Sequence, residues 1–183
     1  DLLANAGNIR EAISACNSWM SGSMSFTSDN ERPVQPVRIY RKHMGRCGEY
    51  QDMRNAIARA GLIPSTCALN SAEDHVWNEF WDGRWIHWDG AVDNPLMYEN
   101  GWGKTISSVW DTRGDGHIVQ VTPRYSEGYC NFTALVLDPG DDPVDGALVR
   151  IATENYYNPD MLTTTTWGTT DHTGTVTIPL GDG

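Results

Sequence analysis

Three residues of this chain have the types that a thiol-dependent acyl-transfer site requires. Cys47 lies in the segment Gly-Arg-Cys-Gly-Glu-Tyr, His75 opens one strand-like segment, and Asp89 closes the next. A cysteine nucleophile needs a thiol, an imidazole that moves its proton and a carboxylate that orients the imidazole. The types and order of these residues therefore predict thiol chemistry, and they say much less about the substrate.

The surroundings of Cys47 favour a reactive thiol. Apolar residues recur at helical spacing after it, so Cys47 is predicted at or just before the first turn of a helix, which ends at a left-handed Gly61. Amide groups and the positive dipole end at a helix start stabilise a thiolate and can donate to an oxyanion. Gly45 and Gly48 carry no side chains and are predicted to let a substrate backbone approach.

The loop between the two strand-like segments decides whether His75 and Asp89 can meet. A two-residue turn at Asp82-Gly83 would put them on opposite faces of the hairpin. A three-residue loop at residues 81–83, with Gly83 left-handed, sets His75 directly opposite Asp89. The triad therefore predicts the three-residue loop.

Other histidines and cysteines are predicted to have structural roles. His87 and His117 have no comparable partners and are expected in loops or on the surface, and Cys67 has no basic neighbour. If the nucleophile is free, at most one disulfide can form among the other three cysteines, Cys16, Cys67 and Cys130. No CxxC pair occurs, which excludes a zinc site built on that motif.

The composition is that of a folded, acidic protein. Of the 183 residues 39% are hydrophobic, eight are tryptophans, and the formal net charge is −11. This charge argues against nucleic acid and against anionic membranes as partners. No apolar run approaches the ~20 residues of a membrane span, and no signal peptide is evident. Because the chain begins at Asp1 without a methionine, it is expected to be processed or excised from a longer protein.

The pattern divides the chain into two modules and predicts an α+β fold class. Residues 1–127 mix helical and strand patterns, whereas residues 128–183 are rich in Thr, Val, Gly and Asp. Strands are predicted at residues 132–137, 147–151 and 174–178, separated by turn signals. Only three or four strands fit into the second module, whereas an immunoglobulin-like sandwich has about seven. The second module is therefore expected to be a partial sandwich, either cut short or leaning on the first module.

Several segments occur in an order that matches a known pattern: Gly45–Tyr50, Ala60–Pro64, Asp74–Glu79 and Gly83–Asp89. Together with residues 93–104 and 123–125, they resemble the transglutaminase-like superfamily, with the closest likeness to its peptide:N-glycanase branch. The resemblance implies a papain-like core, in which the helix that carries the nucleophile packs on an antiparallel sheet. It implies that Cys47 is the nucleophile, His75 the base and acid, and Asp89 the orienting carboxylate. Unlike eukaryotic glycanases, the chain has no paired CxxC zinc module before the nucleophile.

The C-terminal module has a resemblance of its own. Residues 143–147 and 170–174 resemble a carboxypeptidase-regulatory-like β-sandwich. Such modules often accompany secreted or envelope enzymes, so the resemblance implies an extracellular or cell-envelope location.

Residues beyond the triad are candidates for two further roles. Papain-type sites often use an upstream Gln or Trp side chain, so the resemblance implies Gln35 and Trp19 as candidates for oxyanion binding. The candidates for the substrate cleft are Glu49, Trp77, Trp88 and Trp102. The tryptophans are expected to build the core and line the cleft, with a sugar-stacking wall as the alternative.

The predicted function is a cysteine-dependent amidohydrolase or acyltransferase that acts on amide bonds of proteins or peptides through an acyl-enzyme. Hydrolysis is favoured over cross-linking because the likeness is to glycanases. The alternatives are a peptide:N-glycanase that deglycosylates Asn-linked glycopeptides, a cysteine protease or cross-linking transglutaminase, and a non-catalytic envelope binding protein. The expected partner is a protein, peptide or glycopeptide substrate. No metal or organic cofactor is expected, and the sequence leaves the oligomeric state open.

Overall fold

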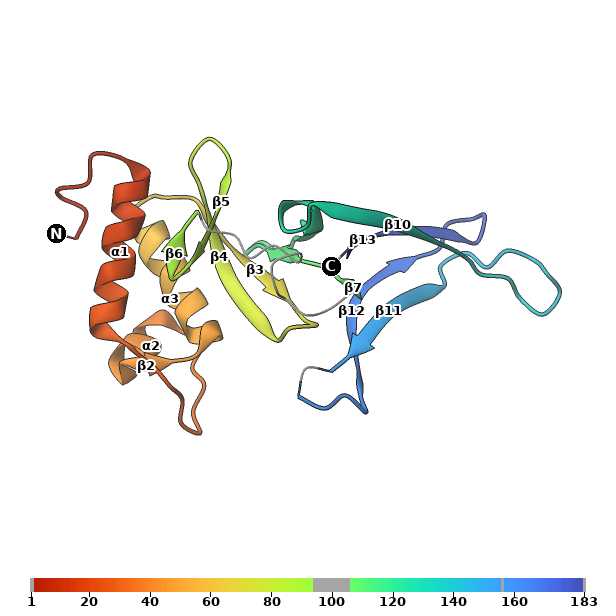
Figure 1. Ribbon diagram of the computed structural model, residues 1–183, viewed down its shortest axis with the longest axis horizontal. Coiled ribbons are helices and arrows are strands. Elements are labelled where there is room, and N and C mark those ends of the chain that lie inside the picture. The colour runs from red at the N-terminus through yellow and green to blue at the C-terminus, as the bar shows by residue number, and fades with distance from the viewer. Residues whose placement is uncertain (1, 94–105, 156, 183) are drawn as a thin grey trace. The chain divides into compact units, whose positions relative to one another are not determined.

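The computed structural model describes residues 2–93, 106–155 and 157–182 (Figure 1). Helices and strands are mixed, and the long hairpins pair antiparallel, which fits the predicted α+β class. The chain forms two compact units that interleave in the sequence. The first comprises residues 1–69, 76–95 and 111–118, and the second comprises residues 70–75, 96–110 and 119–183. The sequence predicts one boundary after residue 127, whereas these units alternate along the chain.

The described α-helices and most residues of the larger sheet belong to the first unit. The described helices are α1 (Ile9–Ser23), α2 (Pro36–Lys42) and α3 (Cys47–Ala60). A short parallel pair joins β1 (Ser25–Phe26) and β2 (Met44–Gly45). The larger sheet has the order β6-β5-β4-β3-β8-β9. Its strands are β3 (Ser65–Asn70), β4 (His75–Trp81), β5 (Trp85–Asp89), β6 (Ala91–Val92), β8 (Trp110–Thr112) and β9 (Ile118–Gln120).

Helix α1 begins where its capping residues dictate. The Asn8 side chain accepts a hydrogen bond from the Glu11 amide at 2.9 Å. The Glu11 carboxylate in turn accepts one from the Gly7 amide at 2.7 Å. The first of these bonds satisfies an amide that a helix start leaves without a partner. Asn8 is therefore the N-cap, and the sequence predicts it correctly.

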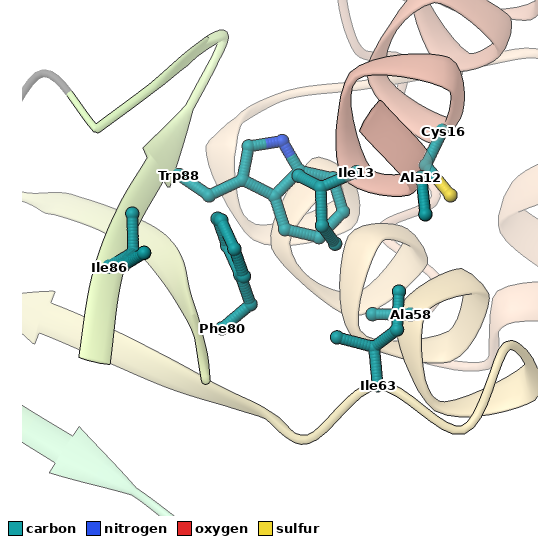
Figure 2. Packing of buried hydrophobic residues seen from close by; sticks show 8 residues of the cluster. All are labelled: Ala12, Ile13, Cys16, Ala58, Ile63, Phe80, Ile86 and Trp88. Atoms are coloured by element: carbon teal, nitrogen blue, oxygen red, sulfur yellow. The ribbon is translucent and has the colours of Figure 1, made fainter. Parts of the chain in front are cut away.

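A cluster of buried apolar side chains joins α1 and α3 to the β4–β5 hairpin. Figure 2 shows its members, Ala12, Ile13, Cys16, Ala58, Ile63, Phe80, Ile86 and Trp88. The rings of Phe80 and Trp88 meet edge to face, with centroids 6.3 Å apart. A fully buried side chain of this size contributes about 1.5–3 kcal/mol. The cluster therefore fixes the helix that begins at Cys47 against the hairpin that ends at Asp89.

The second unit contains two small sheets. One has the order β10-β13-β7 and the other pairs β11 with β12. The strands are β7 (Ile106–Ser107), β10 (Gly128–Leu135), β11 (Leu148–Glu154), β12 (Leu162–Thr169) and β13 (Thr175–Asp182), with the short 3-10 helix η2 (Thr122–Arg124) before β10. Val176, Ile178 and Leu180 of β13 pack with Val149 and Ile151 of β11, which joins the two sheets.

The predicted strands of the second unit are confirmed, with one omission. The predictions at residues 132–137, 147–151 and 174–178 fall on β10, β11 and β13. Strand β12 contains the threonine run at residues 163–166, which the pattern does not assign to a strand. Strand β7 lies before residue 127 and pairs Ser107 with Gly181 of β13. A strand from the predicted first module therefore extends the sheet of the second.

Among the residues that the structure describes, no helix has both the length and the apolar character needed to cross a bilayer.

Candidate active site

Cys47 is the first residue of α3, as the sequence predicts. The first hydrogen bond of the helix runs from the Tyr50 amide to the Arg46 carbonyl at 2.9 Å. The amides of Cys47, Gly48 and Glu49 precede this bond, so they belong to the set that points out of a helix start. The thiol therefore occupies the positive end of the α3 dipole.

The buried Glu49 side chain caps the start of α3. Its carboxylate accepts the Arg46 amide at 2.8 Å and the Nη2 group of Arg32 at 2.8 Å, and it also accepts Arg32 Nε. Burial acts to raise the pKa of Glu49, but the Arg32 and backbone hydrogen bonds outweigh it, and the net pKa is lowered. Glu49 is only 4% exposed. Its prediction as a cleft residue is wrong, because the side chain is a buried helix cap.

The two glycines beside Cys47 differ in what they make possible. A Cβ on Gly45 would lie 2.3 Å from the Cβ of Glu49, which no side chain tolerates. A Cβ on Gly48 would meet its nearest neighbour, Arg32 Nη2, at 3.8 Å, an ordinary contact. Gly45 is therefore needed for the approach of Glu49, and the contacts do not support the predicted role of Gly45 in admitting a substrate backbone.

One face of α3 is fastened to the sheet by polar side chains. Cys47, Gln51 and Arg54 stand at positions i, i+4 and i+7, so they share that face. Gln51 Nε2 donates to the Ala68 carbonyl of β3 at 2.8 Å and to the Trp77 carbonyl of β4 at 2.5 Å. Asn78 Nδ2 of β4 donates back to the Gln51 carbonyl at 3.0 Å. These buried bonds, which sequence reasoning missed, orient the face of the helix that carries Cys47.

The β4–β5 hairpin has the predicted loop length at a different position. Phe80 pairs with Ile86 and Trp81 with Trp85, so the loop comprises residues 82–84. Gly83 has a φ of 75°, as predicted for the left-handed position. The predicted loop at residues 81–83 is wrong by one residue.

Contacts of Trp81 explain why the loop is displaced. The Trp81 amide donates to the Pro64 carbonyl at 2.9 Å, and its ring meets that of Trp85 at 5.5 Å between centroids. This cross-strand pair keeps Trp81 in the strand. Continued along the strands, the same register sets Trp77 opposite Asp89, so the prediction that His75 is directly opposite Asp89 is wrong.

The three residues predicted to form the triad do not all belong to the same unit. Cys47 and Asp89 belong to the first unit, while His75, the first residue of β4, ends a segment that belongs to the second. Asp89 is linked to α3 through Arg54, whose Nη1 lies 3.0 Å from Asp89 Oδ1. An ion pair thus joins Asp89 to α3. That His75 acts on Cys47 stays a prediction.

Tryptophan candidates for the cleft lie in the core. Trp77 and Trp88 are both 0% exposed. Trp88 packs in the cluster of Figure 2, and its Nε1 donates to Asn17 Oδ1 at 3.4 Å. The expectation that these tryptophans build the core is confirmed, and their prediction as cleft residues is wrong because neither reaches the surface. Trp102 lies outside the described residues.

Candidates for oxyanion binding lie on two helices. Gln35 is an exposed residue at the N-cap of α2, where its backbone carbonyl accepts the Arg38 and Ile39 amides. Trp19 of α1 is half-buried and stacks on Tyr40 with ring centroids 5.5 Å apart. Neither contact tests an oxyanion role, which stays a prediction for both residues.

Two predictions about histidines have different outcomes. His87, expected on the surface, is 6% exposed in β5, where its ring faces Trp77 at 5.9 Å between centroids. The prediction fails because β5 lies between β4 and β6 in the larger sheet, and its three middle residues, Ile86 to Trp88, are all buried. His117 is an exposed loop residue beside Asp115, as predicted.

Cys67 is a second thiol of the first unit, and it is held in the neutral form. Asn55 Nδ2 donates to its sulfur at 2.5 Å. Burial, and then the nearby Asp52 carboxylate, raise the pKa of Cys67 to about 11. The thiol lines a cavity of about 330 Å³ together with Asp52, Asn55 and Arg59. This arrangement agrees with the predicted structural role, and Cys16, Cys47, Cys67 and Cys130, all of which the structure describes, form no disulfide.

Comparison with known proteins identifies the region that contains this site. Residues 1–90 match the sequence profile of the transglutaminase-like superfamily. The match covers 90 of the 183 residues, just under half of the chain. The predicted resemblance to this superfamily is confirmed, and the matched region includes Cys47, His75 and Asp89.

Similar proteins also point to one branch of the superfamily. A peptide-N(4)-(N-acetyl-beta-glucosaminyl)asparagine amidase of Yarrowia lipolytica is 40% identical over 94 residues, 48% of this chain and 26% of that protein. The Caenorhabditis elegans amidase of the same name is 35% identical over 96 residues, 49% of this chain and 16% of its own length. The human amidase is 35% identical over 107 residues, 55% of this chain and 16% of its own. The chain thus spans about a quarter or less of the length of these relatives.

Proposed function

We propose that the transglutaminase-like domain of this chain is a cysteine-dependent amidase that cleaves the side-chain amide of glycosylated asparagine. The curated relatives are named for action on N-acetylglucosaminyl-asparagine. This substrate class is therefore better supported than an unspecified peptide amide. The observation that carries the proposal is the position of Cys47 as the first residue of α3, inside the matched domain.

The proposed reaction has two halves. The Cys47 thiolate attacks the side-chain carbonyl carbon of the glycosylated asparagine, and first-turn amides of α3 donate to the oxyanion. The C–N bond breaks, the His75 imidazolium gives its proton to the departing glycosylamine, and a thioester remains on Cys47. His75 then takes a proton from water, which attacks the thioester. Aspartate leaves, the thiolate returns, and Asp89 holds the imidazole in the required orientation throughout.

The proposal extends to the architecture around the site. A papain-like core is supported by α3, which begins at the nucleophile and is fastened to β3 and β4 by Gln51 and Asn78. An immunoglobulin-like sandwich in the second unit is supported by the two sheets that share Val176 and Ile178 in their core. The extracellular or envelope location suggested by the C-terminal module stays a prediction.

Oxygen-18 water provides a direct test. The chain is incubated with an Asn-linked glycopeptide in labelled water, and the peptide product is sequenced by mass spectrometry. The proposal expects free glycan and an aspartate that carries one labelled oxygen at the former glycosylation position. Cys47→Ala should abolish this product, and Cys67→Ala, the control on a thiol with a raised pKa, should leave it unchanged. An intact glycopeptide with the wild-type chain would contradict the proposal.

The same reaction mixture separates the alternatives. A protease would cut the peptide backbone and leave the glycan attached. A cross-linking enzyme would incorporate a labelled primary amine, which is added to a parallel sample. A non-catalytic binding protein would retain the glycopeptide without changing its mass, and its Cys47 would react with iodoacetamide like an ordinary thiol with a pKa of about 8.5.

A further inference from the structure

Arg54 is a buried charge whose position stability alone does not explain. Its side chain is 7% exposed, and burial lowers the pKa of its guanidinium while Asp89 acts to raise it. Its Nε is buried and makes no hydrogen bond with any residue that the structure describes. Burying an ion pair costs desolvation free energy that its own attraction often fails to recover, and an apolar residue of similar volume is frequently as stable. A buried arginine at this point therefore calls for another role.

The environment of Arg54 holds the guanidinium in one place. Its Cζ lies 5.6 Å from the ring centroid of Tyr50, one turn earlier on α3, and 5.9 Å from that of Trp88 on β5. Asp89 and Tyr50 are the titratable groups that act on it. With an aromatic ring from each element and a carboxylate 3.0 Å from Nη1, the guanidinium has little freedom to move.

Asp89 is restrained from two sides. Its backbone enters a tight turn in which Asp89 pairs with Ala91 and Gly90 has a φ of 78°. Its Oδ1 accepts Arg54 Nη1 from the interior, while the carboxylate itself is 24% exposed. A carboxylate that accepts a hydrogen bond from a buried guanidinium, at a backbone position fixed by a tight turn, has little freedom to move. Restraint of this kind is what an orienting carboxylate requires, since small displacements cost large factors in rate.

The spacing along α3 links this ion pair to the nucleophile. Arg54 follows Cys47 by seven residues and shares its helix face, about 10 Å away along the axis. Gln51, between them on that face, is bonded to β3 and β4. The helix face that carries Cys47 is therefore tied to the carboxylate that the proposed reaction uses.

We propose that Arg54 is a positioning residue that fixes the Asp89 carboxylate relative to Cys47. Its positive charge also partly offsets the negative charge of Asp89, so that Asp89 orients His75 without holding it permanently in the imidazolium form. This inference rests on the proposed function of the Cys47 site. It assigns to α3 two parts of the mechanism, the nucleophile at its first residue and the support of the orienting carboxylate two turns later.

Alkylation of Cys47 by iodoacetamide tests the inference without a substrate. The rate is measured against pH in the full chain for the wild type, His75→Ala, Arg54→Met and Arg54→Lys, with modification at Cys47 quantified by peptide mapping. Arg54→Met removes a positive charge and leaves the negative charge of Asp89 without the offset that Arg54 provides. Both changes favour the protonated forms of the Cys47 thiol and the His75 imidazole. Arg54→Met is therefore expected to raise the alkylation midpoint by about one pH unit, and Arg54→Lys, which keeps the charge, should stay near the wild type.

Controls separate a positioning role from a structural one. Arg59→Met removes an arginine on the same helix whose guanidinium donates to the Ser65 carbonyl, and it should leave the midpoint unchanged. If Arg54→Met does not fold, Arg54→Gln replaces it, since its amide can still donate to Asp89 without charge. With a glycopeptide, both neutral variants should lower kcat about tenfold or more at nearly unchanged KM.

The outcomes distinguish the two proposals. If the wild type shows no His75-dependent alkylation below the ordinary thiol range, the proposed function fails. If the wild type shows it, and a folded Arg54→Met or Arg54→Gln variant keeps the same midpoint and the same kcat, the positioning role of Arg54 is overturned while the function stands.

Discussion

Cys47 and Cys67 are both half-buried thiols of the first unit, yet their surroundings act in opposite directions. Cys47 begins α3, where amides point outward and Arg32 offsets the charge of Glu49. Cys67 lies in β3, where burial and the carboxylates of Asp52 and Asp111 raise its pKa. Exposure is therefore a poor guide to reactivity, and the local field distinguishes a candidate nucleophile from an inert thiol.

The largest expected contrast is in catalysis. Cys47→Ala should lower the rate of glycopeptide deglycosylation by a factor on the order of 10⁴ or more, because the acyl-enzyme cannot form. Cys67→Ala should retain nearly the full rate, as measured by release of labelled glycan. Equal losses of rate in the two variants would contradict the prediction that Cys47 is needed for catalysis and Cys67 is not.

Alkylation rates should separate the two thiols within one sample. With a pKa of about 11, Cys67 carries roughly three hundredfold less thiolate at neutral pH than a thiol with the ordinary pKa of about 8.5. Iodoacetamide should therefore label Cys47 at least about a hundredfold faster. Time-resolved peptide mapping of the native chain measures both rates. Comparable rates would contradict the predicted difference in reactivity between the two thiols.

Gly45→Ala should disturb the surroundings of Cys47 and leave those of Cys67 unchanged. Its Cβ would lie 2.3 Å from the Cβ of Glu49, so the helix cap must move. The free energy of unfolding should fall by about 1–3 kcal/mol, measured by urea denaturation. Gly48→Ala is the matched control: its Cβ has room, and alanine is the better helix former by up to about 1 kcal/mol. A harmless Gly45→Ala would exclude the proposed need for close packing.

Glu49 should make the cap sensitive to acid. Because its pKa is lowered in the folded state, its contribution to stability is present above the ordinary glutamate pKa of about 4.3. That contribution is lost as the pH falls through the lower folded value. Glu49→Gln should cost about 1 kcal/mol at neutral pH, and the difference should shrink in acid. Urea midpoints measured across this range check the prediction, which a constant difference would refute.

The smallest expected effect concerns Asp52. Its carboxylate is one cause of the raised pKa of Cys67, and its own pKa is raised by burial and then by Glu49. Asp52→Asn should speed alkylation of Cys67 by about three- to tenfold. Cys67 should still react more slowly than Cys47. An unchanged rate would show that Asp52 does not contribute to the raised pKa of Cys67.

Local signals in the sequence account for much of the fold that is observed. Asn8 and Glu11 cap α1 as predicted, and α3 begins at Cys47 because polar and glycine residues precede a run with helical spacing. The end of α3 was located correctly at Gly61, but its predicted left-handed conformation is wrong, since Gly61 has a φ of −84° and Leu62 has 59°. A Cβ at Gly61 would lie 2.6 Å from Leu3 Cδ1, the end of a flexible side chain, which would have to shift.

Features that depend on distant contacts could not be predicted in this way. The hairpin register depends on the bond between Trp81 and Pro64 and on the pairing of two tryptophans. Likewise, Arg54 resembles any charged residue on a helix until β5 brings Asp89 to it. The threonine run in β12 did carry a signal, since β-branched residues favour strands, and it could have been assigned from that property.

Strand β7 has a practical consequence for anyone who expresses part of this chain. Two residues near the middle of the sequence pair with the last strand, Ser107 with Gly181 and Ile106 with Asp182. A gene fragment that starts at residue 128 would leave that edge of β13 without its partner, and bare strand edges invite aggregation. Cloning boundaries for the C-terminal unit are therefore better set upstream of residue 106 than at the change in composition.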